Sequence, residues 1–241
     1  MQTTIFIPLS GRKHCWEILS KFLENQNINK NLFHLFLLDT SGDDKFNLIL
    51  KNWLEKKCNY ANFELEKKSF STIKNLVGFQ RKKNFSEVNH VMCGIYNYAK
   101  NIIKGEYIFI IEDDVIPPLN AFNMLKKHLN NNVVAVSGAY QIRCRKNLWV
   151  AWDSMNSPVI SKRGKGVSQV ASTGFGCILL KSNDFIDSEI SWHYRNTPWP
   201  WGYDMEFFSK QKKKVLINWD VFCDHLDENT LKSINVKKLK I

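Results

Sequence analysis

The stretch Y-I-F-I-I-E-D-D, residues 107–114, decides the fold class of this 241-residue chain. Its first five residues are aromatic or β-branched and follow a Lys104-Gly105 turn, so they predict a buried strand. Three carboxylates, residues 112–114, come at the end of that strand. Two full charges ~5 Å apart repel each other by on the order of 3 kcal/mol at an effective dielectric of 20. A bound divalent cation would reverse the sign of this energy.

The acidic tripeptide allows two interpretations. If the alternation of a strand continues, Glu112 and Asp114 face one side and Asp113 the other, at the kind of strand end where open α/β proteins bind ligands. In the second interpretation, Asp113 and Asp114 form a solvated turn that favours the N-terminus of a helix begun by Pro117 or Pro118. The tripeptide alone does not decide between a metal site and such a turn.

The first half of the chain alternates strand-like and helix-like segments. Strands are expected over residues 3–9, 32–38, 106–112 and 133–140, with a short one within 70–79. Helices are expected over residues 15–25, 44–57, 86–102 (with Ser86 as N-cap) and 119–130. This β-α order predicts a parallel sheet with helices on both faces.

The second half is less regular. Residues 141–172 predict irregular strands and a loop, and the glycine-bearing segment 173–180 predicts a turn into a strand. A helix is expected over 203–213 and a last strand over 215–222. The basic tail, residues 230–241, is helical or disordered in this interpretation.

Composition favours an ordinary globular protein, since 44% of the residues are hydrophobic and 24% are charged. No apolar stretch approaches the roughly 18 residues of a membrane span, and no basic segment precedes the first strand, so we expect no signal peptide. The six cysteines have no zinc spacing and are expected to be reduced in a cytoplasmic protein. The net charge of +11 favours anionic partners or a solvated Lys-rich surface.

In this order the motifs resemble those of the GT-A-fold nucleotide-sugar glycosyltransferases, family 2-like members in particular. The resemblance runs from Ile5 to His225, and Glu112-Asp113-Asp114 is similar to the D-x-D-type motif of the family. Its other elements are a strand ending at Pro8, a strand ending at Asp39, the segment Thr173-Gly174-Phe175-Gly176, the helix start Gly202-Tyr203-Asp204-Met205-Glu206, and the strand-terminal His225. Two departures stand out: Asn89 has no neighbouring Arg, and Tyr203 replaces the usual Glu.

The resemblance implies an α/β, GT-A type, Rossmann-like fold with a mostly parallel sheet flanked by helices and a mixed second half on the acceptor side. It implies one domain over residues 1–241. Residues 1–118 would bind the nucleotide sugar, residues 119–229 would bind the acceptor, and residues 230–241 would form the basic tail.

The resemblance also implies roles for individual residues. Asp114 and His225 would hold a divalent cation, and a mixed carboxylate–imidazole set favours Mn²⁺ over Mg²⁺. Asp204, with Glu206 behind it, would be the catalytic base. The nucleotide-sugar pocket would contain Pro8, Ser10, Arg12, Asp39, Glu112 and Asp113. The alternatives are structural: His225 as a loop histidine, Asp204 as an N-cap, and Asp39 as an Asx-type turn.

The acceptor site is expected near a cluster of tryptophans. Trp199 and Trp201, just before the Gly202 helix start, would form its walls because sugar rings stack on aromatic faces, and Gly174 would contribute from the glycine-bearing turn. Core packing is the alternative for these rings.

The expected function is metal-dependent transfer of a sugar, UDP-linked in our interpretation, to a hydroxyl of a glycan or glycolipid, with inversion. The expected location is the cytoplasm, with contact to an anionic membrane surface at its inner face. Two alternatives stay open: transfer to modified nucleic-acid bases, where nucleic acid is the partner, and an inactive module that binds nucleotide sugars or glycans.

Overall fold

The computed structural model describes residues 3–70, 85–143, 145, 147–195 and 201–226. The strands are β1 Thr3–Leu9, β2 Phe33–Asp39, β3 Asn62–Lys67, β4 Tyr107–Ile111, β5 Val115–Ile116, β6 Val133–Ala139, β7 Ala151–Trp152, β8 Val167–Val170, β9 Ser172–Thr173, β10 Cys177–Lys181, β11 Lys214–Phe222 and β12 Asp224–His225. The α-helices are α1 Lys13–Asn25, α2 Asp44–Lys56, α3 Phe85–Ala99, α4 Ala121–Lys126, α5 Ser182–Ile186 and α6 Tyr203–Ser209, and a 3-10 helix covers Lys30–Leu32.

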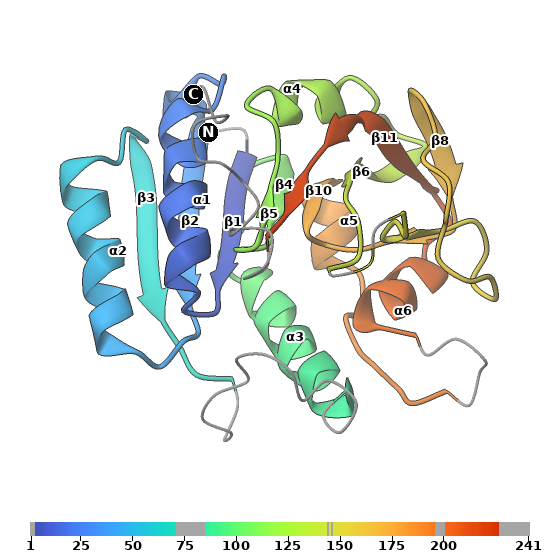
Figure 1. Cartoon of the computed structure of the whole chain (residues 1–241), viewed down its shortest axis with the longest axis horizontal. Helices are drawn as coiled ribbons and strands as arrows, with labels where there is room; N and C mark the ends of the chain where they lie inside the picture. Colours follow the sequence, from blue (N-terminus) through green and yellow to red (C-terminus); the bar gives the residue numbers. More distant parts are fainter. Residues whose placement is uncertain (1–2, 71–84, 144, 146, 196–200, 227–241) are drawn as a thin grey trace.

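Eight strands form one central sheet in the order β3-β2-β1-β4-β10-β6-β11-β8 (Figure 1). The four strands β3, β2, β1 and β4 are parallel to one another. Strand β10 runs antiparallel to both of its neighbours, and β8 runs antiparallel to β11. The expected fold class is therefore confirmed: a mostly parallel sheet with a mixed second half.

Both faces of the sheet are covered, because the strands are apolar on each side. On one face, Ile5, Ile7 and Leu35 pack with side chains of α1, α2 and α4. On the other face, Phe6 and Ile110 pack with side chains of α3, α5 and α6. Figure 1 shows α1 in front of β2 and α2 beside β3 at the left edge, with α3 and α6 in its lower part. Because both faces of the sheet are buried, the sequences of these strands are continuous apolar runs without alternation.

Some boundaries differ from the expectations. The strand next to β2 is β3, Asn62–Lys67, and not a segment of 70–79; of that range only residue 70 is described. Ser86 lies inside α3, whose described part begins at Phe85. Helices α4 and α6 are shorter than expected. The basic tail lies outside the described residues.

Two further observations concern the cysteines and the length of the helices. Five cysteines lie in the described part of the chain, and all five are free thiols. In that same part, no helix has the length and apolar character that a membrane crossing requires.

Candidate functional site

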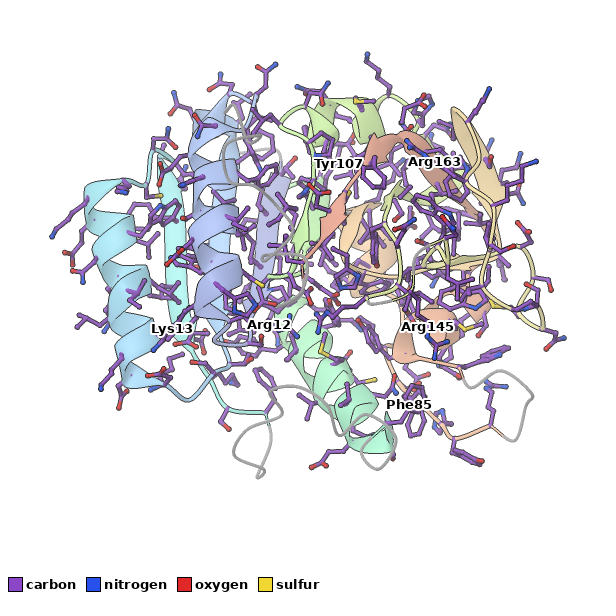
Figure 2. The ribbon with its side chains drawn as sticks, viewed as in Figure 1. Arg12, Lys13, Phe85, Tyr107, Arg145 and Arg163 are labelled. Atoms are coloured by element: carbon purple, nitrogen blue, oxygen red, sulfur yellow. The ribbon has the colours of Figure 1, made fainter. Side chains whose placement is uncertain are left out.

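The candidate site lies where β1 and β4 end side by side. Strand β1 is parallel to β4 and to β2, so the three strands end at the same edge of the sheet. The arrows of β1 and β3 point to the lower side of Figure 1. Figure 2 shows Arg12 there, at the start of α1 and near the centre of the molecule. This edge brings the segment after β1 against the acidic tripeptide after β4.

Asp113 is bound by the segment that follows β1. Its Oδ2 accepts hydrogen bonds from the backbone N–H and the hydroxyl of Ser10, at 2.7 and 2.8 Å. Its Oδ1 accepts one from Nη1 of Arg12 at 2.6 Å. These three hydrogen bonds satisfy the buried carboxylate of Asp113 and join the ends of β1 and β4.

Asp114 lies at the centre of a charged cluster. Its Oδ2 is 2.7 Å from Nη1 of Arg12 and forms a second ion pair with Nη2 of Arg143. Nε2 of His225 lies 3.5 Å from the same oxygen. Only 3% of the Asp114 side chain is exposed, so its charge needs these partners.

The expected alternation of the tripeptide is wrong. Asp113 and Asp114 share the guanidinium of Arg12, whereas Glu112 contacts Tyr96 and Tyr203 instead. The reason is that β4 ends at Ile111 and the chain turns, with the N–H of Val115 donating to the carbonyl of Glu112 at 3.0 Å. A turn does not follow the two-residue period of a strand.

His225 reaches the tripeptide through a short strand pair. Strand β12 runs antiparallel to β5, with His225 opposite Val115, and the N–H of Leu226 donates to the carbonyl of Asp114 at 2.7 Å. Nδ1 of His225 lies 2.7 Å from the carbonyl oxygen of Gln141, so Nδ1 carries the proton that it donates. Burial lowers the pKa of His225 to about 4. At neutral pH its Nε2 therefore presents a lone pair.

The Asp114–His225 pair fits a divalent cation with two protein ligands. Metal–ligand bonds of about 2.0–2.2 Å to imidazole and carboxylate can be made from two atoms that are 3.5 Å apart. The bond from Nδ1 to a backbone carbonyl is the support that ligating histidines usually have. Within the described residues no group of three or more acidic, His or Cys side chains could hold a metal. The remaining ligands of a cation would have to come from substrate and water.

Glu112 has two tyrosine partners. The hydroxyls of Tyr96 and Tyr203 both donate to its Oε1, at 3.0 and 3.1 Å. The two rings are stacked with 5.3 Å between their centroids. Burial raises the pKa of both phenols, so they remain hydrogen-bond donors. The tyrosines join α3 and α6 to the end of β4.

Asp204 lies in the first turn of α6, one residue after Tyr203. Burial raises the pKa of its carboxyl to about 7, and the negative charge of Glu112 adds to the rise. One carboxylate oxygen accepts a hydrogen bond from the backbone N–H of Met205 at 2.8 Å, and this bond opposes the rise in pKa. Asp204 does not act as the N-cap of α6 as the alternative interpretation expected, because the N-cap residue is Gly202. A carboxyl with this pKa takes up and releases protons near neutral pH.

Glu206 has a different environment. It is buried, and its two oxygens form a bidentate ion pair with Arg195, with Nε and Nη2 each 2.9 Å from one oxygen. The N–H of Glu206 continues the helix by donating to the carbonyl of Gly202. Both carboxylate oxygens of Glu206 are therefore engaged by Arg195, and the pair ties the segment before α6 to the helix.

Pro8 and Asp39 lie at the ends of β1 and β2. Pro8 is buried within β1. The two oxygens of Asp39, also buried, accept from the N–H and hydroxyl of Ser41 and from the side-chain amide of Asn47, the latter at 2.9 Å. The Asx-type turn is thus present, and contact of Asp39 with a nucleotide base stays a prediction.

The structure gives a different result for each of the three residues that were expected at the acceptor site. Trp199 lies outside the described residues. Trp201 packs against the guanidinium of Arg195, whose central carbon is 4.5 Å from the ring centroid. Gly174 is buried, and a Cβ built on it would lie 2.2 Å from the hydroxyl of Tyr140. Close packing is thus one reason for a glycine here, and contact of Gly174 with an acceptor stays a prediction.

Comparison with known proteins gives likeness at the level of structure alone. No family model matches the chain, and no curated protein matches its sequence. Mannosyltransferase PcManGT from Pyrobaculum calidifontis, in complex with GDP-Man and Mn²⁺, matches with a TM-score of 0.61 and 13% identity over 94% of this chain and 57% of that one. S. aureus TarS in complex with UDP-GlcNAc matches with a TM-score of 0.56 and 13% identity over 92% of this chain and 57% of that one.

These likenesses show the fold. The sheet and helices of this chain are arranged as in those two proteins, as the GT-A resemblance implied. The chain spans little more than half of the length of either structure, at 57% in both cases.

Two contributors to the site were not anticipated from sequence. Arg143 lies after β6, in the irregular segment, where no strand end or motif indicates its direction. Tyr96 lies on the apolar face of α3 and looks like a core residue.

Proposed function

We propose that this chain is a family 2-like GT-A glycosyltransferase that moves a sugar from a nucleoside diphosphate, UDP in our proposal, to a hydroxyl of a glycan or glycolipid. The observation that carries this proposal is the grouping of His225 and Asp204 around the acidic tripeptide that contains Asp114. Asp114 and His225 form a two-ligand corner. Asp204 is linked to the same tripeptide through its neighbour Tyr203, and its pKa is raised to about 7.

The donor class is supported by the charges at this edge. Arg12 and Arg143 meet beside Asp114, where they can balance a diphosphate. Ser10 and Asp39 lie at the ends of the first two strands, where a nucleoside would bind in a sheet of this type. Two proteins of the same fold bind GDP-Man and UDP-GlcNAc, respectively, which supports a nucleotide-sugar donor.

The transfer step is assigned to Asp204. Its carboxylate takes the proton of the acceptor hydroxyl while the hydroxyl oxygen attacks the anomeric carbon. The bond from that carbon to the diphosphate oxygen breaks, and the diphosphate leaves with its electron pair. A single displacement of this kind inverts the anomeric configuration. Glu206 is assigned a supporting role, because Arg195 already binds both of its oxygens.

A divalent cation held by Asp114 and His225, Mn²⁺ in preference to Mg²⁺, would stabilise the negative charge of the leaving diphosphate as a Lewis acid. Tyr96 and Tyr203 orient Glu112 beside the donor sugar. Trp201 is proposed as a wall of the acceptor site, with Arg195 fixing its ring.

A ligand screen tests this function. Thermal-shift measurements with UDP- and GDP-sugars and Mn²⁺ should identify a stabilising donor, and that donor should be hydrolysed more slowly in EDTA. Asp114→Asn should abolish turnover, while Asp187→Asn, an exposed Asp after α5, should not.

Three results would contradict parts of the proposal. Undiminished turnover in EDTA would remove the metal. Stabilisation by a nucleotide sugar without any turnover, with every class of acceptor, would favour a binding module. Binding to duplex DNA that weakens steeply with salt would favour a nucleic-acid acceptor.

A further inference from the structure

The first backbone N–H of α6 is bound by a side chain of another helix. The residue before α6 is Gly202, which has no side chain to accept an N–H of the first turn as a Ser or Asp N-cap does. Oδ1 of Asn89 on α3 accepts the N–H of Tyr203 at 2.8 Å. Nδ2 of Asn89 donates to the carbonyl of Phe85, one turn earlier in α3, at 2.7 Å. The buried amide of Asn89 is thus held at both ends and joins α3 to the start of α6.

A second residue of α3 contacts the side chain of Tyr203. The hydroxyls of Tyr96 and Tyr203 both donate to Oε1 of Glu112, and the two rings are stacked. Asn89 and Tyr96 are seven residues apart, about two turns, so they lie on the same face of α3. Helix α3 therefore holds Tyr203 at its backbone N–H and along its ring. These contacts set where Asp204, the next residue, lies relative to Glu112.

The carboxylate of Asp204 is turned back over the glycine that precedes α6. A Cβ built on Gly202 would lie 2.5 Å from Oδ1 of Asp204 and 3.6 Å from Oδ1 of Asn89. The same oxygen of Asp204 accepts the N–H of Met205 at 2.8 Å. The Asp204 carboxylate and the Asn89 amide therefore lie around one place, the place that a side chain at position 202 would fill. A change at Asn89 would reach the Asp204 carboxylate directly.

Ionisable groups from several parts of the described chain face Asp204. They are Glu112 after β4, Tyr140 after β6, Cys93 of α3 and Tyr203 of α6. Burial raises the pKa of the Cys93 thiol and of both phenols, so these three groups are uncharged at neutral pH. Glu112 adds a negative charge, but burial is the main reason that the pKa of Asp204 is raised to about 7. A looser start of α6 would admit water and lower this pKa.

We propose that Asn89 is a positioning residue for the transfer step: by binding the N–H of Tyr203 it keeps the start of α6 packed on α3, and so keeps the Asp204 carboxylate beside Glu112. The inference rests on the proposed function, in which Asp204 is the base. Asn89 has no contact with donor or acceptor in this assignment. Its loss should therefore lower kcat and leave donor binding unchanged.

The first measurement is the pKa of Asp204, followed by NMR in protein labelled with carbon-13 at the aspartate carboxyls. The signal of Asp204 is identified by its absence in Asp204→Asn. Asn89→Ala should lower this pKa from about 7 to about 6, because the carboxyl becomes more exposed to water. Asn89→Asp can still accept the N–H of Tyr203 but adds a negative charge near Asp204, so the pKa should rise to about 8.

The second measurement is hydrolysis of the UDP- or GDP-sugar that stabilises the wild-type protein. Asn89→Ala should lower kcat about tenfold and leave the KM for this donor within about twofold of wild type. Asn89→Asp keeps the bond to α6 and only shifts the titration of the base. Its kcat should therefore return to within about threefold of wild type at about pH 9, where the base has lost its proton.

Asn97→Ala is the matched control. Asn97 lies on the same helix, and its Nδ2 also donates to a backbone carbonyl of the second half, that of Ile190 at 2.6 Å. Asn97→Ala should lose stability in urea unfolding while the pKa of Asp204 and kcat stay as in wild type. Urea unfolding also shows whether each Asn89 variant is folded, and Asn89→Asp carries the test if Asn89→Ala does not fold.

Opposite shifts of the Asp204 pKa in the two Asn89 variants, with a kcat that Asn89→Asp recovers at high pH, support the positioning role. Two results would overturn it: an Asn89→Ala variant that loses only stability, as Asn97→Ala does, or one that raises the donor KM at unchanged kcat. Failure of the proposed function has a different signature. Wild-type protein would then neither bind nor hydrolyse any UDP- or GDP-sugar, whereas the NMR titration would still show whether Asn89 holds Asp204.

Discussion

The hydroxyl of Tyr203 donates a hydrogen bond to Oε1 of Glu112, with 3.1 Å between the two oxygens. This bond joins the first residue of α6 to the residue that follows β4, although 91 positions separate them in the chain. A glutamate at position 203 would bring a second negative charge to Glu112, whereas the tyrosine brings a donor. The bond places Asp204 beside the tripeptide, so the two halves of the proposed site depend on it.

Removing that hydroxyl should weaken the site without unfolding the protein. In Tyr203→Phe, Glu112 keeps the bond from Tyr96 but loses one of its two donors. We expect kcat/KM to fall about five- to tenfold and the free energy of unfolding to fall by about 1 kcal/mol. Steady-state kinetics and urea unfolding measure the two quantities.

Tyr107→Phe is the matched control. Its hydroxyl also donates to a carboxylate, that of Glu106 at 2.6 Å, but at the opposite end of β4 from the tripeptide. Its kcat/KM should be unchanged. Equal kinetic losses in the two variants would contradict a positioning role for Tyr203.

The second prediction concerns the pH dependence of transfer. A base with a pKa of about 7 is active only when it has lost its proton. The kcat/KM should therefore rise through pH 7 and level off above pH 8. Asp204→Asn should lower kcat by about 10²- to 10⁴-fold and abolish this rise. A rise that persists in the residual activity of Asp204→Asn would assign it to another group.

The same pKa shift has a consequence for stability. The folded-state pKa of Asp204 is raised from 3.8 to about 7, so folding favours the protonated form. The stabilising contribution is fully present below pH 3.8 and is lost as the pH rises through 7. Asp204→Asn, which cannot ionise, should therefore gain stability relative to wild type between pH 5 and pH 8. Thermal unfolding at both pH values checks the sign.

The residue pattern along the chain predicted the central strands of the sheet better than its edge strand or the candidate site. Strand β4 was predictable because five apolar residues run into three acids. Strand β3, N-F-E-L-E-K, was missed because an exposed edge strand carries charges on both faces. The side on which the Asp113 carboxylate lies depends on the turn after β4, and the residues of the tripeptide do not predict that turn. Arg143 is brought to Asp114 by tertiary structure, which periodicity cannot reveal.

Glu206 should prove to be structural. Glu206→Gln removes one partner of the bidentate pair with Arg195, and we expect a loss of about 1–2 kcal/mol in unfolding free energy. The loss is limited because 41% of the Arg195 side chain is exposed, so its guanidinium can bind water once the ion pair is removed. The pH at which kcat/KM rises should stay as in wild type. A shifted or absent rise would return Glu206 to the role of base.

Gly174 offers a test that separates packing from acceptor binding. A Cβ at this position would lie 2.2 Å from the hydroxyl of Tyr140 and 2.7 Å from Cγ1 of Val150. Gly174→Ala should therefore reduce stability by about 1–3 kcal/mol. Tyr140→Phe alone should cost about 1 kcal/mol, because that hydroxyl accepts the N–H of Gly176 at 2.9 Å.

The double variant distinguishes the two explanations of Gly174. Without the Tyr140 hydroxyl the new methyl group loses its shortest contact, so the cost of the double variant should be about 1 kcal/mol less than the sum of the single costs. Denaturant unfolding of all four proteins gives the coupling free energy. Strict additivity, together with a raised KM for the acceptor in Gly174→Ala, would mean that the glycine is there to admit the acceptor and not to admit Tyr140.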